Sequence, residues 1–330
     1  MSDAAPDEGA RQPTGPATPL APAPDPGRAA RSVLQAVTSV VLGHDAEVEL
    51  AVATFLAGGH VLIEDVPGVG KTLLAKALAR AVGGPFGRVQ ATADLLPSDI
   101  TGVSVHDPHT QTWTFRAGPL FATVVLVDEL NRATPRAQSA LLEAMAERQV
   151  TVDGTTHALA DPFFVIATQN PRVDHGTFPL VAGQRDRFAT RLRLGIPTPA
   201  VERALLQGSG GTDHLDDVVP VASAEAWRAE QAAAAAIHVD ERVLDYVLAI
   251  AVTVRSHPLG DPELSPRASR TMLRVAQARA LLDRRSYVLP DDVKAVAPSV
   301  LEHRLPPAAG MGDDRAATII ASVAAPPFGS

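Results

Sequence analysis

Short apolar runs alternate with longer amphipathic stretches over the first two thirds of the chain. Continuous runs rich in Val, Ile, Leu and Phe are typical of strands that a parallel sheet buries on both faces. Strands are predicted at 61–63, 87–92 and 163–167, in the run ATVVLVD, and in the alternating stretch that ends before Gly195. Since helical patterns separate these runs, the pattern predicts an α/β domain.

The spacing of apolar residues predicts helices over most of the remaining chain. The expected helices of the first part lie at 29–41, 45–56, 71–81 and 134–148. Beyond residue 220 only helices are expected, at 222–236, 240–255, 267–285 and 291–301. Two alternating stretches with a turn in the middle, 103–115 and 148–159, predict β-hairpins.

These patterns divide the chain into two domains with a tail at each end. We expect the α/β domain to span 29–200 and a smaller all-helical domain to span 221–306, joined by a Gly-, Asp- and Ser-rich linker at 201–220. Residues 1–28 are rich in Pro and Ala and bury too little apolar surface to offset the entropy of ordering, so a disordered tail is expected. Residues 307–330 are expected to be loose.

The composition narrows the class of protein. A length of 330 residues is enough for two well-buried cores. A formal net charge of -8 without a basic stripe argues against a nucleic-acid partner. The chain has no cysteine, so disulfides and thiolate metal sites are excluded. The apolar runs are far shorter than the roughly 20 residues of a spanning helix, so we expect no membrane insertion and a cytoplasmic location.

The most informative stretch is HVLIEDVPGVGKTL, from His60 to Leu73. An apolar strand, a Pro/Gly loop and a helix follow one another, which is the order of a phosphate-binding Walker A loop. The first glycine of the general pattern is replaced by Asp65. The residues predicted to contact a nucleotide here are Val66, Pro67, Gly68, Val69, Gly70, Lys71, Thr72 and Leu73.

Polar residues that end two other strands complete a predicted site for ATP hydrolysis. Asp128 and Glu129 end an apolar strand, where the first carboxylate and the Thr72 hydroxyl would hold Mg²⁺ and the second would polarise the attacking water. Asn170 follows the next apolar strand. Since parallel strands put their carboxyl ends at one edge of a sheet, we expect Asn170 near the γ-phosphate or the water.

Three further features carry weaker signals. The turn at Gly43 and His44 lies where many P-loop ATPases hold the edge of adenine, and a plain turn between helices is the alternative. The stretch GQRDRFATRLRLGIP has four arginines near a strand, Arg185, Arg187, Arg191 and Arg193, and such runs are usually solvated. Arg267 follows Pro266 in the first turn of a long helix, where a cation opposes the helix dipole, so a facing anion is expected.

Together these motifs resemble the MoxR family of AAA+ ATPases, from about Val33 to Leu305. The most specific stretches are DLLPSDITG, VDELNRATPRAQSALLEAMAERQVTVDG, FFVIATQNP and SPRASRTMLRVAQARALL. The family commonly has Asp at the position of Asp65. The chain departs from it in two places, with VAGQRDRF for PEAQLDRF and Gly-His for Gly-Gln at Gly43 and His44.

The resemblance implies roles for individual residues. It makes Asn170 sensor 1, Arg187 an arginine finger that acts on a neighbouring subunit, and Arg267 sensor 2. The additional Arg185 leaves the identity of the finger open. The resemblance further implies a five-stranded parallel sheet, a helical lid, and hairpins that line the central face of a ring, usually a hexamer. Family members act as chaperone-like ATPases on partner proteins, often ones with von Willebrand factor A domains.

The leading hypothesis is therefore a Mg²⁺-dependent ATPase that remodels a partner protein. An ATP-binding switch or scaffold with little turnover is the alternative, although it would have no use for the water-polarising pair Glu129 and Asn170. A nucleic-acid motor is a third reading, which the acidic balance of the chain disfavours. The client and the ring size are not specified by the sequence.

Overall fold

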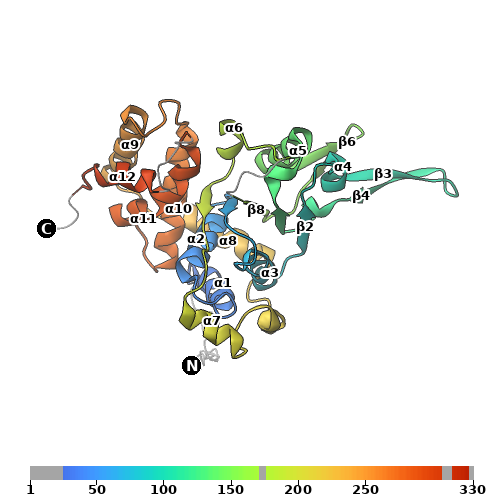
Figure 1. The fold of residues 1–330 in the computed structure, drawn as a ribbon, viewed down its shortest axis with the longest axis horizontal. Helices are drawn as coiled ribbons and strands as arrows, with labels where there is room; N and C mark the ends of the chain where they lie inside the picture. The colour runs from blue at the N-terminus through green and yellow to red at the C-terminus, as the bar shows by residue number, and fades with distance from the viewer. Residues whose placement is uncertain (1–24, 171–175, 307–313, 327–330) are drawn as a thin grey trace, which may run out of the picture.

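The computed structural model describes residues 25–170, 176–306 and 314–326. Its centre is a five-stranded parallel sheet in the order β2-β5-β8-β1-β9 (Figure 1). The strands are β1 (Val61–Glu64), β2 (Phe86–Gln90), β5 (Val124–Asp128), β8 (Phe164–Gln169) and β9 (Thr190–Leu192). Each strand pairs in parallel with its neighbours, which confirms the predicted fold class.

Helices cover both faces of the sheet because successive side chains of each strand point to opposite sides. In β5, Val124 and Leu126 pack on one face, whereas Val125 and Val127 pack on the other. The helices of the α/β domain are α1 (Arg28–Thr38), α2 (Asp45–Leu56), α3 (Lys71–Val82), α4 (Pro97–Thr101), α5 (Pro135–Glu147) and α6 (Ala182–Arg185), with short 3-10 turns at Pro119–Phe121 and Leu130–Arg132.

The structure has two apolar cores, one on each face of the sheet. The boundary between the two domains does not separate them. One core lies under α4 and α5. The other begins at α1, α2 and α3 and continues without a break into the helical domain. Trp227 joins the two domains, since its ring lies 4.7 Å from Phe55, which stacks at 4.5 Å on Phe164 of β8. The two domains are thus in direct contact through these rings.

Most of the helical domain lies beside the α/β domain, at the end of the sheet where β9 is found, whereas its first helix packs against α1 and α2 (Figure 1). Its helices are α8 (Ala224–Ala235), α9 (Glu241–Ser256), α10 (Pro266–Leu282), α11 (Pro290–Leu301) and α12 (Arg315–Ala321), with the 3-10 turn η4 (Glu302–Arg304) after α11. Helix α10 contacts both α11 and α2. None of the helices in the described ranges has the length and apolarity needed to cross a bilayer.

One segment expected to be loose is ordered in part. The C-terminal stretch expected to be loose contains α12, whose Ile319 and Ile320 are buried. Glu302 anchors this helix by accepting a hydrogen bond of 2.8 Å from the Ala316 N–H. Residues 307–313 and 327–330 of the expected tail, like residues 1–24 at the other end, lie outside the described residues.

The expected linker at 201–220 is likewise not a free connection. It contains most of α7 (Pro199–Leu206) and the 3-10 helix η3 (Thr212–Asp217). The Gly211 N–H donates to the carbonyl of Val40 at 2.9 Å, and Leu215 and Val218 are buried. The Gly- and Asp-rich composition of the segment gave no sign of this packing, because few of its residues are apolar and its hydrogen bonds are made to residues distant in the sequence.

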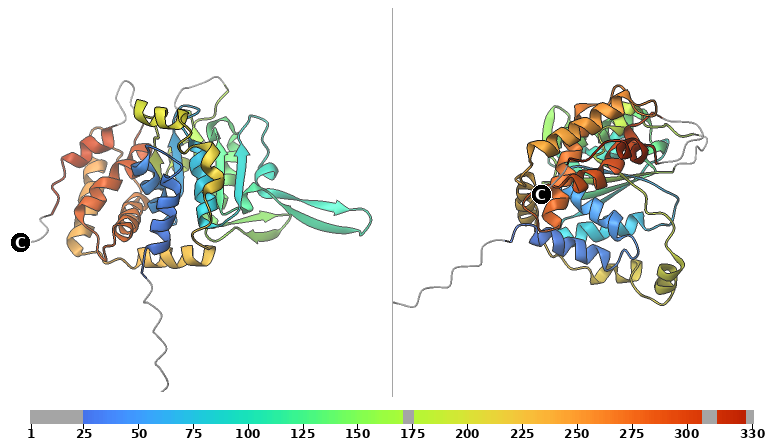
Figure 2. Two further views of the ribbon diagram at one scale, coloured as in Figure 1. Left: turned by 90° about the horizontal axis from the view of Figure 1, so that it is seen from below. Right: turned by 90° about the vertical axis from the view of Figure 1, so that its left-hand side faces the viewer.

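Both predicted hairpins are present as separate two-stranded sheets. They are formed by β3 (Gly102–Asp107) with β4 (Thr112–Ala117), and by β6 (Gln149–Val152) with β7 (Thr155–Ala158). The β3–β4 hairpin projects far from the body of the molecule (Figure 2). The ring of Phe115 stacks at 3.9 Å on His157, which ties the two hairpins together at their bases.

Candidate active site

The loop between β1 and α3 has the backbone geometry that a phosphate site requires. Gly68 and Gly70 have φ angles of 89° and 99°, which L side chains rarely adopt. Helix α3 begins at Lys71, so its free N–H groups face the loop. The Lys71 ammonium donates to the carbonyls of Asp65 (2.8 Å) and Val66 (3.2 Å). Burial lowers the pKa of Lys71, an effect that Asp65 and Asp128 oppose.

Asp65, the departure from the general Walker A pattern, has a structural role. Its Oδ1 accepts from the Val66 N–H at 2.8 Å, and its Oδ2 accepts from the Gly195 N–H at 2.6 Å. The carboxylate therefore ties the start of the loop to the chain that leaves β9. A glycine could not make either contact, so these two hydrogen bonds give a physical reason for Asp at this position.

Most of the predicted site residues line one pocket of about 350 Å³ at the carboxyl edge of the sheet. The parallel register brings the ends of β1, β5 and β8 to this edge. The predicted residues that line it are Pro67, Gly68, Gly70, Lys71, Thr72, Leu73, Asp128, Glu129 and Asn170. Arg88, Gln90, Thr168 and Thr212 line it as well and were not predicted.

The backbone of Glu129 has φ 56° and ψ 46°, in the left-handed region. Its N–H donates to the Thr168 hydroxyl at 2.9 Å. Its carboxylate accepts from Arg132 at 2.9 Å and from Gln90 at 3.5 Å. Arg132 is close because it lies three residues further on, in the turn that Glu129 begins. Thr168 and Gln90 come from β8 and β2, so their proximity depends on the register of the sheet and gave no signal in the sequence.

Asp128 is paired with a cation in the described structure. Arg88 of β2 donates through Nε to Asp128 Oδ2 at 2.9 Å, and its NH2 lies at the same distance. Together with the Thr72 hydroxyl, the Asp128 carboxylate offers the hard oxygen donors that Mg²⁺ prefers, so the donor set fits this metal. Arg88 gave no sequence signal, since an arginine in an alternating strand usually faces solvent.

A second pocket of about 320 Å³ adjoins the first and extends it toward the turn between α1 and α2. Val69, Leu73 and His44 line it, and Thr212 lines both pockets. Gly43 itself packs tightly, since a Cβ there would lie 2.6 Å from a methyl of Val201. The turn predicted to hold the adenine edge therefore borders a cavity that is continuous with the phosphate loop.

Arg187 and Arg267 lie in a different pocket, of about 420 Å³. Gly58, Gly59 and His60, which precede β1, line this pocket, so it is at the amino edge of the sheet, opposite the phosphate loop. The structure places Arg267, predicted as sensor 2, away from the phosphate loop of its own chain, because α10 packs on α2 and its first residues lie at the amino edge. The anion that Arg267 faces is Asp186, at 3.7 Å.

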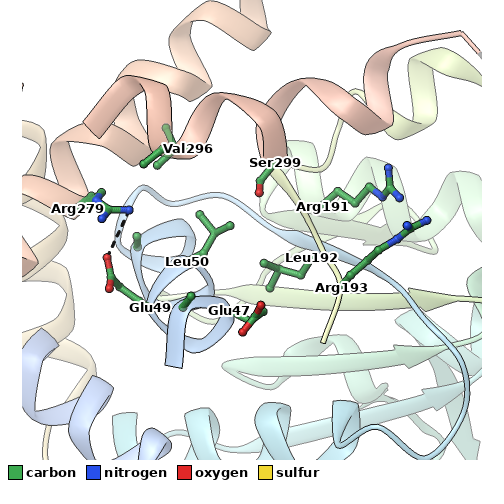
Figure 3. Close-up of a pocket in the computed structure, with 12 residues that line it drawn as sticks. Glu47, Glu49, Leu50, Arg191, Leu192, Arg193, Arg279, Val296 and Ser299 are labelled. Carbon is green, nitrogen blue, oxygen red and sulfur yellow. Dashed lines mark ion pairs between the residues drawn. The ribbon is translucent and has the colours of Figure 1, made fainter. Parts of the chain in front are cut away.

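A cavity of about 310 Å³ lies where the two domains meet, between α2, β9 and α11 (Figure 3). Across it Arg279 NH1 lies 3.7 Å from Glu49, and burial raises the pKa of Glu49. Arg191, expected on a solvated face, is buried, and its Nε lies 2.5 Å from Glu64 Oε2. That expectation was wrong because α11 covers β9.

Comparison with known proteins identifies the family. Residues 60–190 match the family described as "ATPase family associated with various cellular activities (AAA)", and residues 253–323 match the AAA lid domain. The chain is 39% identical to Chaperone MoxR1 of Mycobacterium tuberculosis over 82% of its own length and 73% of that protein. It is 30% identical to Protein MoxR of Methylorubrum extorquens, over 82% and 85%.

The chain belongs to the MoxR family of AAA+ ATPases. YeaC of Bacillus subtilis is 45% identical over 82% of this chain and 84% of that protein. A crystal structure of a Cytophaga hutchinsonii protein superposes on this MoxR chain with a TM-score of 0.81 and 32% identity, covering 90% of this chain and 94% of the other. The match to the lid family extends through α12, which agrees with the packed C-terminal helix.

Proposed function

We propose that this MoxR-family protein hydrolyses ATP with Mg²⁺ and uses the turnover to remodel a partner protein. The observation that carries the proposal is the convergence of Lys71, Thr72, Asp128, Glu129 and Asn170 on one pocket beside a glycine loop. Membership of an AAA+ ATPase family supports the same chemistry. A pure binding switch would need the loop but not the carboxylate and amide beside it.

Each residue has a distinct task in this proposal. The loop N–H groups and Lys71 bind the polyphosphate, and Thr72 with Asp128 hold the metal, which supplies charge neutralisation at the phosphates when bound. Glu129 accepts the proton of the attacking water, and Asn170 orients that water or the γ-phosphate. The cavity beside His44 takes the base.

We further propose that the active form is a ring, as a hexamer, in which each site is completed by the next subunit. The supporting observation is that Arg187 and Arg267 line a pocket at the amino edge, away from the phosphate pocket of their own chain. Both arginines can stabilise transition-state charge only on the nucleotide of a neighbour. A head-to-tail interface whose repeated rotation closes on itself forms a ring.

Between the two candidates for the finger, the contacts favour Arg187. Arg185 donates to the carbonyls of His303 at 2.8 Å and Leu180 at 3.1 Å, and burial lowers its pKa. Arg187 makes a longer bond of 3.2 Å to the Leu142 carbonyl and lines the pocket itself. Arg185 is thus engaged within its own chain.

The proposed partner is a protein rather than a nucleic acid. The relative from Mycobacterium tuberculosis is named a chaperone, and the net charge of -8 disfavours a polyanion. The projecting β3–β4 hairpin, with Trp113 71% exposed, is a surface through which a ring could contact a client, including one with a von Willebrand factor A domain.

The test is a mixing experiment with two variants. Arg187→Ala keeps its own site and lacks the finger, whereas Glu129→Gln keeps the finger and has a dead site. Each alone should lose at least about 100-fold in turnover, since an arginine finger is worth ~10³–10⁵ and a general base ~10²–10⁴. Mixed rings should regain part of the activity. No recovery, with mixed assembly verified by sizing, would reject the role of Arg187 in trans.

A further inference from the structure

The segment that carries Arg187 is held by the end of the helical domain. The turn η4 follows α11, and its last residue, Arg304, is 4% exposed. Its guanidinium donates to the carbonyl of Phe188 at 2.7 Å and to that of Ala189 at 3.2 Å. His303 Nε2 also donates to the Phe188 carbonyl, at 3.0 Å. The backbone on the carboxyl side of Arg187 is therefore fixed to the helical domain, which is the AAA lid.

Asp186, directly before Arg187, completes this attachment. Its Oδ1 accepts from Arg304 Nε at 2.8 Å, and its backbone carbonyl accepts from Arg304 NH2 at 3.3 Å. Burial lowers the pKa of Arg304, and the Asp186 carboxylate opposes that shift. A buried guanidinium needs such a counter-charge, so the two side chains depend on each other.

The same carboxylate also holds the start of α10. The Ser265 hydroxyl donates to both carboxylate oxygens of Asp186, at 3.0 and 3.1 Å, and Arg267 NH1 lies 3.7 Å away. Asp186 thus connects two separate parts of the lid, the amino end of α10 and the turn after α11. Both arginines proposed to act on a neighbour lie within this one arrangement.

We infer that the Asp186–Arg304 pair is a positioning device that makes the placement of Arg187 depend on the position of the lid. This inference rests on the proposed action of Arg187 in trans. A lid that moves against the sheet changes where the 186–189 segment lies, because the pair and the carbonyl contacts move with η4. The lid of one subunit then controls hydrolysis in the next subunit, while its own nucleotide pocket lies at the other edge of the sheet.

The experiment compares Asp186→Asn and Arg304→Lys with a matched control. Arg285→Lys alters another ion pair of the helical domain, in which NH1 lies 2.6 Å from Asp292. The Arg285 side chain bonds to Asp283, Tyr287 and Asp292, at the opposite end of α10 from Ser265. Each variant is measured for binding of a fluorescent ATP analogue, for assembly by sizing, and for turnover, both alone and mixed with Glu129→Gln.

Asp186→Asn and Arg304→Lys should bind the analogue within about twofold of the parent, since a factor of two is only ~0.4 kcal/mol. Their turnover alone should fall at least about tenfold, because a displaced finger loses part of its ~10³–10⁵ effect. Mixing with Glu129→Gln should restore activity, since that chain supplies a correctly held finger. Arg285→Lys should turn over like the parent. If the Asp186–Arg304 pair served only to stabilise the fold, the variants would lose turnover that mixing with Glu129→Gln does not restore.

The outcomes separate the inference from the proposed function. If Arg187→Ala recovers on mixing while Asp186→Asn and Arg304→Lys do not, or if the latter two keep parental turnover, the positioning role is rejected alone. If Arg187→Ala itself fails to recover, the action in trans is rejected. Should Asp186→Asn and Arg304→Lys not fold, Ser265→Ala is the further test, since it removes only a hydroxyl that bonds to Asp186. Its turnover should then fall by a factor that mixing restores, and unchanged turnover would overturn the inference.

Discussion

The Thr168 hydroxyl accepts a 2.9 Å hydrogen bond from the backbone N–H of Glu129. This bond crosses from β8 to the residue that follows β5, so it fixes the proposed general base by means of the neighbouring strand. A non-glycine residue in the left-handed region costs about 1–2 kcal/mol, and Glu129 has φ 56°. The strained backbone is held where its carboxylate lines the pocket with Asp128 and Asn170.

We therefore expect Thr168→Val to impair turnover without abolishing nucleotide binding. Valine has the same shape but leaves the Glu129 N–H without its acceptor, at a cost of about 1–3 kcal/mol. Turnover should fall about tenfold, since ~1.4 kcal/mol in a barrier is a factor of ten. Thr168→Ser keeps the hydroxyl and serves as the control. Equal turnover of the valine and serine variants would show that the bond does not position Glu129.

Lys71→Ala should weaken ATP binding by about 10- to 100-fold, because a charged hydrogen-bond donor is worth ~1.5–3 kcal/mol. Its ammonium already donates to two loop carbonyls, so it lies at the mouth of the phosphate loop. Lys76→Ala, five residues further along α3 and not among the residues that line the pocket, is the control and should bind like the parent. Titration of a fluorescent ATP analogue measures both. A parental affinity for Lys71→Ala would remove the loop from the proposed site.

The two tryptophans of the chain should differ sharply in their contribution to stability. Trp227 is fully buried against Phe55, between the helical domain and the sheet, so Trp227→Ala should lower the free energy of unfolding by about 3–5 kcal/mol. Trp113 is 71% exposed on the β3–β4 hairpin, and Trp113→Ala should change the free energy of unfolding by less than about 0.5 kcal/mol. Urea unfolding followed by circular dichroism makes the comparison. Similar losses in both variants would contradict the role of Trp227 as the joint between the domains.

The sequence predicted those parts of the fold that depend on local patterns. The strand before Lys71 and the strand that ends at Asp128 are continuous apolar runs, and the requirement that parallel strands end together brought Asn170 to the same pocket. The glycine loop could be recognised because its chemistry depends on residues adjacent in sequence.

Features that depend on how separate elements pack could not be predicted. The place of Arg267 depends on the docking of α10 against α2, which no spacing within α10 reveals. Arg88 reaches Asp128 only because β2 pairs with β5 in one register. The 201–220 segment and α12 are ordered by a few buried apolar residues within polar or Ala-rich sequence, so composition alone indicated loose chain.

The last prediction concerns the pH dependence of stability and rests on His60. This side chain is buried beneath the amino end of the sheet, where its Nδ1 accepts from the Val165 N–H at 3.1 Å and its Nε2 lies 3.3 Å from the Met145 carbonyl. Burial lowers the pKa of His60 from 6.5 to about 4, and Arg148 adds to the shift. Between these two values the unfolded chain binds a proton that the folded chain does not. The stabilising contribution is therefore complete above pH 6.5 and is lost as the pH falls toward 4.

The expected loss from His60 is about 2 kcal/mol between pH 7 and pH 5, given ~1.4 kcal/mol per pKa unit. His60→Gln offers a donor to Met145 and an acceptor to Val165 but cannot titrate, so its stability should depend less on pH by that amount. His303, whose pKa burial also lowers well below its ordinary value, is present in both proteins and cancels in the difference. Urea unfolding at pH 7, 6 and 5 measures the two slopes. Parallel slopes would mean that His60 already carries its proton in the folded protein or that it never becomes protonated over this range in either state.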